Sequence, residues 1–525
     1  MRIFVLGIGT GPHGAIYRLD RRSQFNRWPK ENGVCLGEAG LWNILFRSGA
    51  DPTLVNGSEI LQPQEGDVLY VSCDSLCPIE HRKALDHWME NGGLVVGMGN
   101  AAAWEFAFAG GANLVHSRHD HPYAALAWVF DGSNPELIAP PRWGYGTLRP
   151  KSPSGVTCYG NVAVIHGERQ TPARALISRI EDAPAILNHG RFWYLNGHPF
   201  AAMQSWLQGQ EDLEPWIAWR HRLFWLDELG AYLCGILRAH RLLPEQRLLP
   251  ALARTTVVFK HDVDDSRDTT YLDSENDRRV VGVYPILKDA NAKYWVRKLA
   301  SHEGHESAFH YNTASYSRFI EAARHGLLKL EKRPMRPNRK GIEGAGLLEQ
   351  VRWAKRNGIG TQTLHRHAFF LLYPELIDAL DTVFDNERHV LGSNSYFRGL
   401  VLRWGVDVAD GMRGTYGSFP DPQFPYWFPF RLAHAGDGGR MLRGWESTSM
   451  MELEPGLVEQ MLDYKNPHLS QQVFVFNYHP AHAAGRTFAN GGCAPWFREV
   501  LELCSRRGVE IMTLADVYRR LNACV

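Results

Sequence analysis

The chain has 525 residues, of which 44% are hydrophobic and 22% are charged, the ordinary composition of a globular protein. This composition excludes disorder, a collagen repeat and a coiled coil as descriptions of the whole chain. The 57 Lys and Arg residues balance the 56 Asp and Glu residues and leave a net charge of +1. A chain so balanced has no global field that would attract nucleic acid or an anionic membrane, and we expect neither partner.

The cysteines and the N-terminus indicate the compartment. Eight cysteines are scattered along the chain without a Cys-x-x-Cys pair, which is not the pattern of a secreted disulfide framework. No stretch approaches the ~20 apolar residues that a membrane span needs. The short apolar run at 1–9 ends in glycine and lacks the cleavage site of a signal peptide, so we interpret it as a strand. These features predict a cytoplasmic protein.

The domain organisation follows from length and hydrophobic patterning. At about 150 residues per domain, the length suggests two to four domains. In the first half, short apolar strands alternate with helices, which predicts a parallel sheet. The proline-flanked segment 242–250 predicts a linker, so we expect domains at 1–245 and 252–525. The expected strands are 2–7, 67–72, 94–98, 156–160, 163–166, 192–196 and 255–260, and the expected helices are 37–49, 78–91 and, within a helical stretch at 199–242 that breaks near 211–215, 216–242.

The pattern over residues 67–99 is a strand, Ser72-Cys-Asp-Ser-Leu76, a helix, Asn91-Gly-Gly93 and another strand. It loosely resembles a class I glutamine-amidotransferase-like domain, which implies a flavodoxin-like parallel sheet. That family carries a nucleophilic Cys after the second of these strands, but Gly97-Met-Gly-Asn-Ala101 contains none, so we expect a non-catalytic domain. A dinucleotide fingerprint starting at Gly7 would need glycine where Pro12 stands, so we expect no nucleotide cofactor.

Carboxylates follow the first strand expected in the second half. The apolar run 255–260 leads directly into Asp262, Asp264 and Asp265. Acids at the carboxyl end of a parallel strand lie where α/β proteins bind ligands, and Asp262 and Asp264 share one face of an extended chain. One of them could bind a cation while the other takes a proton. The alternative is that the segment only caps a helix or makes a turn.

Histidines gather at three further places in the second half. His302, His305 and His310 lie within nine residues, and a turn of helix could bring the first two to one metal ion. The other histidines end two predicted strands, and imidazole suits zinc and related metals. A single histidine is more often a core residue than a ligand, but four polar strand ends on one rim of a barrel favour a metal site. These strand-end histidines are His365, His367 and His479, with His482 just beyond.

The order of these motifs resembles the polysaccharide deacetylase family with its NodB-homology domain. The closest match is Gly304-His-Glu-Ser-Ala-Phe-His310, and Asp262-Val-Asp264 resembles the Asp-x-Asp form of the first motif. Leu364-His-Arg-His367 with Tyr373-Pro-Glu375 resembles the third motif, and Asn477-Tyr-His479 the last. The resemblance covers about 254–520. It implies a distorted (β/α)7 barrel, one divalent metal ion that is usually zinc, and hydrolysis of an N-acetyl group on a sugar.

The resemblance also implies a role for each matching residue. Asp262 would be the general base, and His479 would be the general acid that protonates the leaving amine. Asp264 and His310 would bind the metal ion, and Arg366 would orient the base. In the family, the metal ion lowers the pKa of a bound water and polarises the acetyl carbonyl.

One position departs from the family pattern. The family supplies a second histidine ligand four residues after the first, and Ala314 stands there. His305 would fill the position, or His365 or His367 would do so instead. The remaining alternatives are a metal ion held by fewer protein ligands and a degenerate site.

An aromatic segment lies between the third and the last motif. Gly414–Phe430 is rich in aromatic residues and proline, and aromatic faces stack on sugar rings. We therefore expect a substrate wall, for which a proline-braced lid over the barrel core is the alternative. The aromatic residues expected to bind substrate are Tyr416, Phe419, Tyr426 and Trp427.

The motifs together predict a metal-dependent hydrolase, with zinc as the expected ion, that removes N-acetyl groups from a glycan or a glycan precursor. Ala314 favours a second hypothesis, a catalytically silent glycan-binding or scaffold protein. The retention of Asp262, Asp264, His310 and His479 argues against it. A third possibility is hydrolysis of an amide that is not part of a sugar.

Overall fold

The computed structural model divides into two compact units. One comprises Met1–Arg220, Tyr232–Arg247 and Ala433–Met441, and the other comprises His221–Ala231, Leu248–Leu432 and Leu442–Val525. The change of unit after Arg247 falls within the segment expected to be a linker. The described residues are 1–7, 37–56, 62–73, 81–99, 101, 104–105, 114–117, 124–129, 135–139, 147–151, 155–171, 174–196, 199–207, 224–246, 249, 252–263, 266–311, 344–366, 375–396, 426–433, 440–480, 483 and 493–525.

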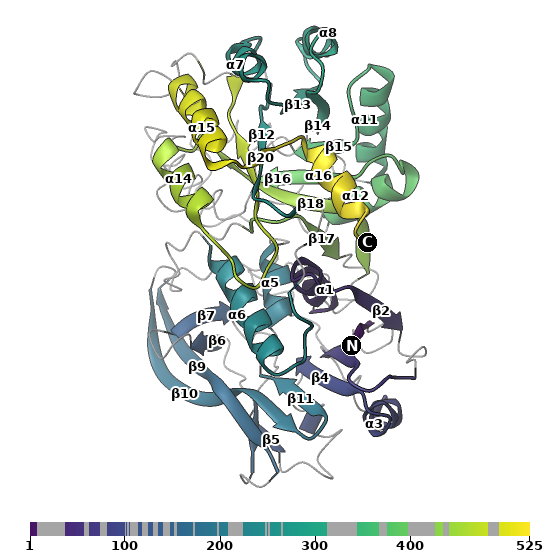
Figure 1. Ribbon diagram of the computed structural model, residues 1–525, viewed down its shortest axis with the longest axis vertical. Helices are drawn as coiled ribbons and strands as arrows, with labels where there is room; N and C mark the ends of the chain where they lie inside the picture. The colour runs from purple at the N-terminus through teal and green to yellow at the C-terminus, as the bar shows by residue number, and fades with distance from the viewer. Residues whose placement is uncertain are drawn as a thin grey trace. The chain divides into compact units, whose positions relative to one another are not determined.

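The N-terminal unit is built on a sheet whose first part is parallel (Figure 1). Its described strands have the order β2-β1-β3-β4-β11-β10-β9-β6-β7. β1 (Ile3–Gly7) lies between β2 (Pro52–Asn56) and β3 (Val68–Cys73), and β4 (Leu94–Gly99) joins β3 to β11 (Phe192–Leu195). This 2-1-3-4-5 order is that of flavodoxin-like sheets. The predicted parallel-sheet unit is confirmed.

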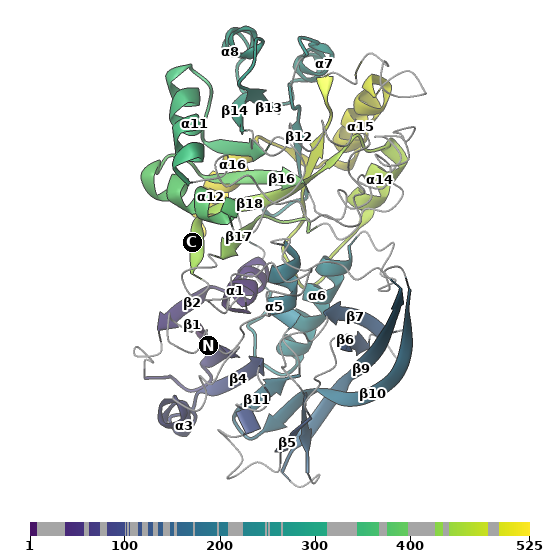
Figure 2. The ribbon, with the colours of Figure 1, turned by 180° about the vertical axis from the view of Figure 1, so that it is seen from behind.

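Helices lie on both faces of these parallel strands. Gly40 in α1 (Gly37–Arg47) is so close to the backbone of α5 (Pro199–Leu207) that a Cβ there would overlap the Phe200 carbonyl. α3 (Arg82–Glu90) lies on the other side of the strands in both views (Figures 1 and 2). The close approach at Gly40 explains why this helix, predicted at 37–49, carries glycine on its packed face.

The second part of this sheet is antiparallel and differs from the prediction. Strands expected at 156–160 and 163–166 form one strand, β9 (Thr157–Thr171), which pairs along its length with β10 (Arg174–His189). β10 was not predicted. Gly160 has a φ of 59°, which interrupts the alternation of side chains along the strand. The sequence pattern therefore does not show that β9 is one strand, and only its pairing with β10 does. The remaining described strands of this unit are β6 (Ala124–Val129) and β7 (Pro135–Ala139) in the sheet, and the separate pair β5 (Leu114–Ser117) and β8 (Thr147–Pro150).

The C-terminal unit is a parallel barrel. Among the described residues, seven parallel strands form a ring, which closes because β12 pairs with both β13 and β19. The barrel class predicted from the sequence is therefore confirmed. In ring order the strands are β12 (Thr256–Lys260), β13 (Gly282–Leu287), β14 (Glu306–Tyr311), β15 (Thr363–Arg366), β16 (Gly392–Tyr396), β18 (Met441–Met451) and β19 (Val473–Asn477), with β17 (Phe430–Ala433) and β20 (Glu510–Ile511) added outside the ring.

Helices surround the barrel, and one covers its amino end. In α16 (Leu514–Asn522), the Ala515 N–H donates to Glu306 Oε2 at 2.9 Å and the Tyr518 hydroxyl to the Ser393 carbonyl at 2.6 Å. Because Glu306 and Ser393 stand at the start of their strands, α16 lies at the amino end of the barrel. The surrounding helices in Figures 1 and 2 are α7 (Thr270–Arg278), α8 (Ala292–Ala300), α11 (Gly344–Arg356), α12 (Glu375–Asn386), α14 (Pro455–Asp463) and α15 (Ala494–Arg507).

Two expected helices differ in extent from the prediction. The helix expected at 78–91 begins at Arg82, and residues 74–80 lie outside the described part of the chain. The helix expected at 216–242 appears as α6 (Trp225–Ala239), and residues 208–223 lie outside it too. In the described part of the chain, no helix is long and apolar enough to cross a membrane.

Replacing Gly392 by alanine tests the packing of the barrel. The new Cβ would overlap the Trp445 carbonyl and approach the Tyr518 ring to 2.6 Å, because β16 is packed between β18 and α16. We expect Gly392→Ala to lower the free energy of unfolding by about 1–3 kcal/mol, measured by urea denaturation. Gly456→Ala is the control, because nothing lies within 4 Å of its Cβ in the first turn of α14. Equal effects of the two substitutions would contradict this packing.

Candidate active site

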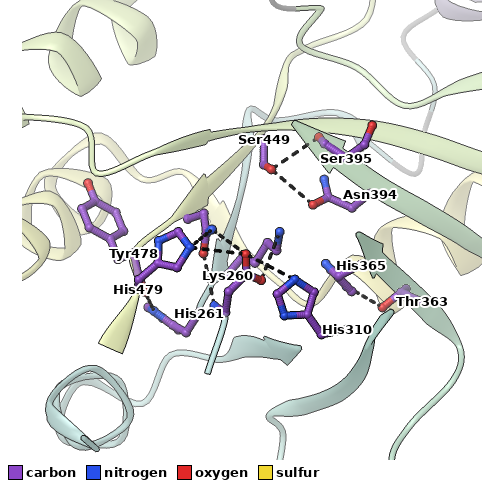
Figure 3. Close-up of polar contacts among 12 residues, drawn as sticks. Lys260, His261, His310, Thr363, His365, Asn394, Ser395, Ser449, Tyr478 and His479 are labelled. Atoms are coloured by element: carbon purple, nitrogen blue, oxygen red, sulfur yellow. Dashed lines mark hydrogen bonds and ion pairs between the residues drawn. The ribbon is translucent and has the colours of Figure 1, made fainter. Parts of the chain in front are cut away.

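Polar side chains form a row across four neighbouring barrel strands. His310 of β14 is in register with His365 of β15, which pairs with Asn394 of β16, and Asn394 pairs with Ser447 of β18. The Asn394 amide donates to the Ser447 hydroxyl at 3.1 Å. The Ser449 hydroxyl donates to Asn394 Oδ1 at 3.2 Å, as Figure 3 shows. Barrel interiors are usually filled by branched apolar residues, so a buried polar row here needs another explanation than packing.

An ion pair lies at the carboxyl end of β12. Lys260 ends the strand and Asp262 follows two residues later, so alternation puts both side chains on one face. Lys260 Nζ lies 3.2 Å from Asp262 Oδ1, and neither side chain is more than 1% exposed. A buried carboxylate is costly unless it is paired and hydrogen-bonded. Lys260 therefore stabilises the ionised form of Asp262.

The other carboxylate oxygen of Asp262 faces three further side chains. Asn477, at the end of β19, donates from Nδ2 to Asp262 Oδ2 at 2.9 Å. His479 Nε2 lies 3.6 Å and His310 Nε2 lies 3.9 Å from the same oxygen. At these longer distances, the two imidazole rings are near the carboxylate but form no direct hydrogen bond with it. Asp262 is thus the centre of the candidate site.

A carboxylate orients the His479 ring by binding the ring nitrogen that does not face Asp262. Glu452 Oε1 lies 2.9 Å from His479 Nδ1 and accepts the His479 backbone N–H at 2.8 Å. A carboxylate only accepts, so Nδ1 carries a proton and Nε2 faces Asp262. Glu452 has a φ of 49°, a backbone conformation that costs free energy in a residue other than glycine. That conformation, immediately after β18, is what aims the carboxylate at His479.

His365 is held in its neutral form. Burial lowers the pKa of His365 well below its ordinary value, and the positive charge of Lys260 lowers it further. The Thr363 hydroxyl donates to Glu306, so its oxygen accepts from His365 Nε2, 3.0 Å away. The lone pair of this ring is therefore on Nδ1. His365 is a neutral donor-acceptor in the site.

Arg366 does not join this group. It follows His365 in β15 and so points to the other face of the strand. There its charge interacts with Tyr311 and Glu446, and burial lowers the pKa of Arg366 to about 10. Glu446 accepts hydrogen bonds from the Ser393 and Ser395 hydroxyls, and burial raises its pKa to about 7. The structure thus places Arg366, predicted to orient the base, in a separate polar cluster.

His305 lies at the opposite end of β14 from His310. It precedes the first residue of the strand, and at 3.3 Å per residue the two histidines are roughly 16 Å apart. The Gly282 N–H donates to His305 Nδ1 at 3.0 Å, and Nε2 lies 3.1 Å from Asn276 Oδ1. His302 and His305 lie in a turn and not in a helix. The structure therefore does not bring His305 to Asp262, and both of its nitrogens bind elsewhere.

The described residues do not make a complete zinc site. Within the described ranges, no three His, Cys, Asp or Glu side chains are arranged to hold a metal ion. Of the predicted ligands, His310 and His365 lie in the site, while Asp264, His367 and position Ala314 lie outside the described residues. Lys260 is a fixed positive charge on Asp262 Oδ1, which suits a base better than a ligand. A bound zinc ion stays a prediction, and Asp264 is the residue that would have to complete its site.

The two described aromatic residues of the predicted substrate wall are buried. Trp427 is fully buried, and its ring packs 5.1 Å from that of Phe474 and 6.5 Å from that of Phe224 in the core. Tyr426 is 1% exposed. This placement corresponds to the alternative of a lid over the barrel core. Tyr416 and Phe419 lie outside the described residues.

The roles of three residues of the site were not predicted. Lys260 is a lysine that ends an otherwise apolar strand two residues before Asp262, a signal that strand alternation could have used. Asn477 stands in the same relation to His479 at the end of β19. Glu452 had no such signal, because its role comes from its backbone conformation.

Comparisons with known proteins do not assign this chain to a family. Neither the models of protein families nor the curated proteins contain a match to this chain. Among solved structures, an exo-β-1,4-mannosidase from Opitutaceae bacterium strain TAV5 is 13% identical with a TM-score of 0.25, over 38% of this chain and 32% of the mannosidase. The Xyl-CE4 domain of a multidomain xylanase from the hindgut metagenome of Trinervitermes trinervoides is 8% identical with a TM-score of 0.23, over 51% of this chain and 92% of that domain. The functional argument therefore depends on the site itself.

A double-mutant cycle tests the buried pair. Lys260→Met leaves Asp262 buried without its cation, and we expect a loss of about 3–5 kcal/mol in the free energy of unfolding. Lys260→Met combined with Asp262→Asn should lose less than the sum of the two single variants, because neither charge then remains. The control is Lys355→Met, whose ion pair with Glu387 is exposed and is worth at most about 1 kcal/mol. Additive losses in urea denaturation would show that the two side chains are not coupled.

Proposed function

We propose that the barrel is a hydrolase that removes N-acetyl groups from a carbohydrate, with its active site at the carboxyl ends of the strands. The observation that carries the proposal is the convergence of an ion-paired carboxylate, Asp262, and a carboxylate-oriented imidazole, His479. A base and an acid close to each other are what amide hydrolysis needs. The carbohydrate substrate comes from the motif resemblance, as does the N-acetyl group.

Asp262 is the general base of the proposed reaction. Lys260 and Asn477 hold it in its ionised form, and its Oδ2 faces His479 and His310. A water molecule beside Oδ2 would give its proton to the carboxylate as its oxygen attacks the acetyl carbon. Lys260 adds a fixed positive charge close to the developing oxyanion, where such a charge lowers the barrier.

His479 is the general acid. Its Nδ1–H is bound to Glu452, which fixes the ring and stabilises its protonated form. Protonated Nε2 would then give its proton to the sugar nitrogen as the C–N bond breaks. The products are acetate and a free amine, and the proton that Asp262 accepted balances the one that His479 gives.

Substituting the acid and the base tests this assignment. We expect Asp262→Asn and His479→Gln each to lower kcat for acetate release from N-acetylated oligosaccharides by about 10²–10⁴-fold. His389→Gln is the matched control, because His389 is partly exposed and contacts Thr361 away from the site. Full activity in either site variant, with the thermal midpoint unchanged, would remove that residue from the mechanism.

Metal content tests the zinc prediction separately. We expect about one zinc ion per chain in the wild type and little in Asp264→Ala, measured by plasma mass spectrometry on proteins purified in parallel. The control is Asp277→Ala, on the outer helix α7. No metal in any sample, even after incubation with zinc, cobalt or nickel, would overturn the zinc prediction.

A catalytically silent glycan-binding or scaffold protein is the second candidate function. Ala314, at the position of the family's second histidine ligand, favours it. A silent barrel would bind a glycan without releasing acetate, and Asp262→Asn would leave that binding unchanged. The cytoplasmic location and the amidotransferase-like origin of the N-terminal unit stay predictions.

A further inference from the structure

A second buried polar cluster lies behind the candidate site and takes no part in the proposed chemistry. His261 and Glu275 are fully buried, and His261 Nε2 lies 2.9 Å from Glu275 Oε1. The other ring nitrogen, Nδ1, lies 2.8 Å from the Tyr478 carbonyl oxygen. We call these three groups the His261 clamp. A carbonyl can only accept, so Nδ1 carries a proton and donates a hydrogen bond to the Tyr478 carbonyl oxygen.

The clamp joins the two strand ends that carry the proposed acid and base. His261 stands between Lys260 and Asp262, and Tyr478 stands between Asn477 and His479. The last pair in the ladder between β12 and β19 is Lys260 with Asn477, followed by the Tyr478 N–H donating to the Lys260 carbonyl at 2.9 Å. The His261 side chain adds one more hydrogen bond just beyond the point where the ladder stops.

The surroundings of the clamp hold the ring in one orientation. The His261 ring stacks on Tyr271 of α7 at 4.9 Å and meets the edge of Phe497 of α15 at 5.2 Å. The Tyr284 hydroxyl donates to Glu275 Oε2 at 2.6 Å, and His305 Nδ1 lies 3.4 Å from the same oxygen. Tyr271 and Phe497 belong to helices outside the barrel, so the His261 clamp and the site lie on opposite faces of β12.

Gly282 packs directly against the Glu275 carboxylate. Gly282, the first residue of β13, lies against both oxygens of Glu275, and a Cβ at this position would overlap them. The absence of a side chain at Gly282 therefore leaves the space that the Glu275 carboxylate occupies beside His261. The same carboxylate is what turns the ring so that Nδ1 points to Tyr478.

We propose that His261 is a positioning residue for the reaction, held by Glu275 and bound to the Tyr478 carbonyl. By fixing the end of β12 to the end of β19, it sets the 3.6 Å separation between Asp262 Oδ2 and His479 Nε2. A displacement of about 1 Å between catalytic groups can cost about 10²-fold in rate. This inference rests on the proposed function, because it gives His261 a role in that site.

Two substitutions at His261 separate its two hydrogen bonds. His261→Asn places an amide near the position of Nδ1 and keeps the bond to Tyr478, whereas His261→Gln reaches toward Glu275 and loses that bond. We expect His261→Gln to lower kcat by about 10²-fold with KM changed less than about twofold. His261→Asn should retain kcat within about tenfold of the wild type. Equal losses in both variants, a change confined to KM, or no loss in either would overturn the proposal.

A second measurement does not depend on activity. In protein labelled with ¹⁵N-histidine, the ring signals of His479, assigned by their loss in His479→Gln, report its contact with Glu452 and Asp262. We expect these signals to shift in His261→Gln and to stay in place in His261→Asn, with His389→Gln as the control. Unchanged His479 signals in His261→Gln would overturn the positioning role. If the wild type hydrolyses no acetylated sugar, the proposed function fails, and this measurement still decides whether His261 positions His479.

Discussion

The burial of the Asp262 carboxylate is the constraint on which the barrel site depends. A charge inside a closed barrel costs several kcal/mol unless a partner and hydrogen bonds replace its water. Lys260 and Asn477 supply these on the two oxygens of Asp262. Both partners end strands adjacent to each other in the barrel, so the charge compensation and the β12–β19 ladder stabilise the same arrangement. A chain that folds this barrel therefore also sets the position of the carboxylate.

Other buried acids of the molecule show what a directly paired cation changes. Glu306 accepts hydrogen bonds from Thr363 and from the backbone of Ala515, and burial raises its pKa to about 7. For Glu446, hydrogen bonds from Ser393 and Ser395 and the positive charge of Lys260 lower the pKa, but burial outweighs them and raises it to about 7. For Asp67 in the N-terminal unit, burial acts in the same direction, but the hydrogen bonds from Arg2 outweigh it and the pKa is lowered. Hydrogen bonds and a cation that is not directly paired do not offset burial at Glu306 and Glu446, whereas the directly paired Arg2 does so at Asp67.

The sequence predicted the fold class and the strand ends that carry the polar residues of the candidate site, because both follow from local patterns. Apolar runs ending in polar residues marked the strands that carry Asp262, His310, His365 and His479, and parallel strands bring such ends together. It did not predict β10, whose stability comes from pairing with β9, or Glu452, whose role comes from a backbone angle. His305 shows a further limit. Five residues from His310 in the sequence, it lies at the other end of the same strand.

Strand alternation also explains how one short segment can serve two purposes. In Lys260-His261-Asp262 and in Asn477-Tyr478-His479, the outer residues face the site, and the middle residue faces the helices outside. The middle residues bind each other through His261 Nδ1 and the Tyr478 carbonyl. The outer residues bind each other through Asn477 and Asp262. Polar contacts on both faces of the same two strand ends leave these ends little freedom to twist or slide. Buried, well-connected polar groups of this kind hold a single geometry more firmly than apolar packing, which tolerates small shifts.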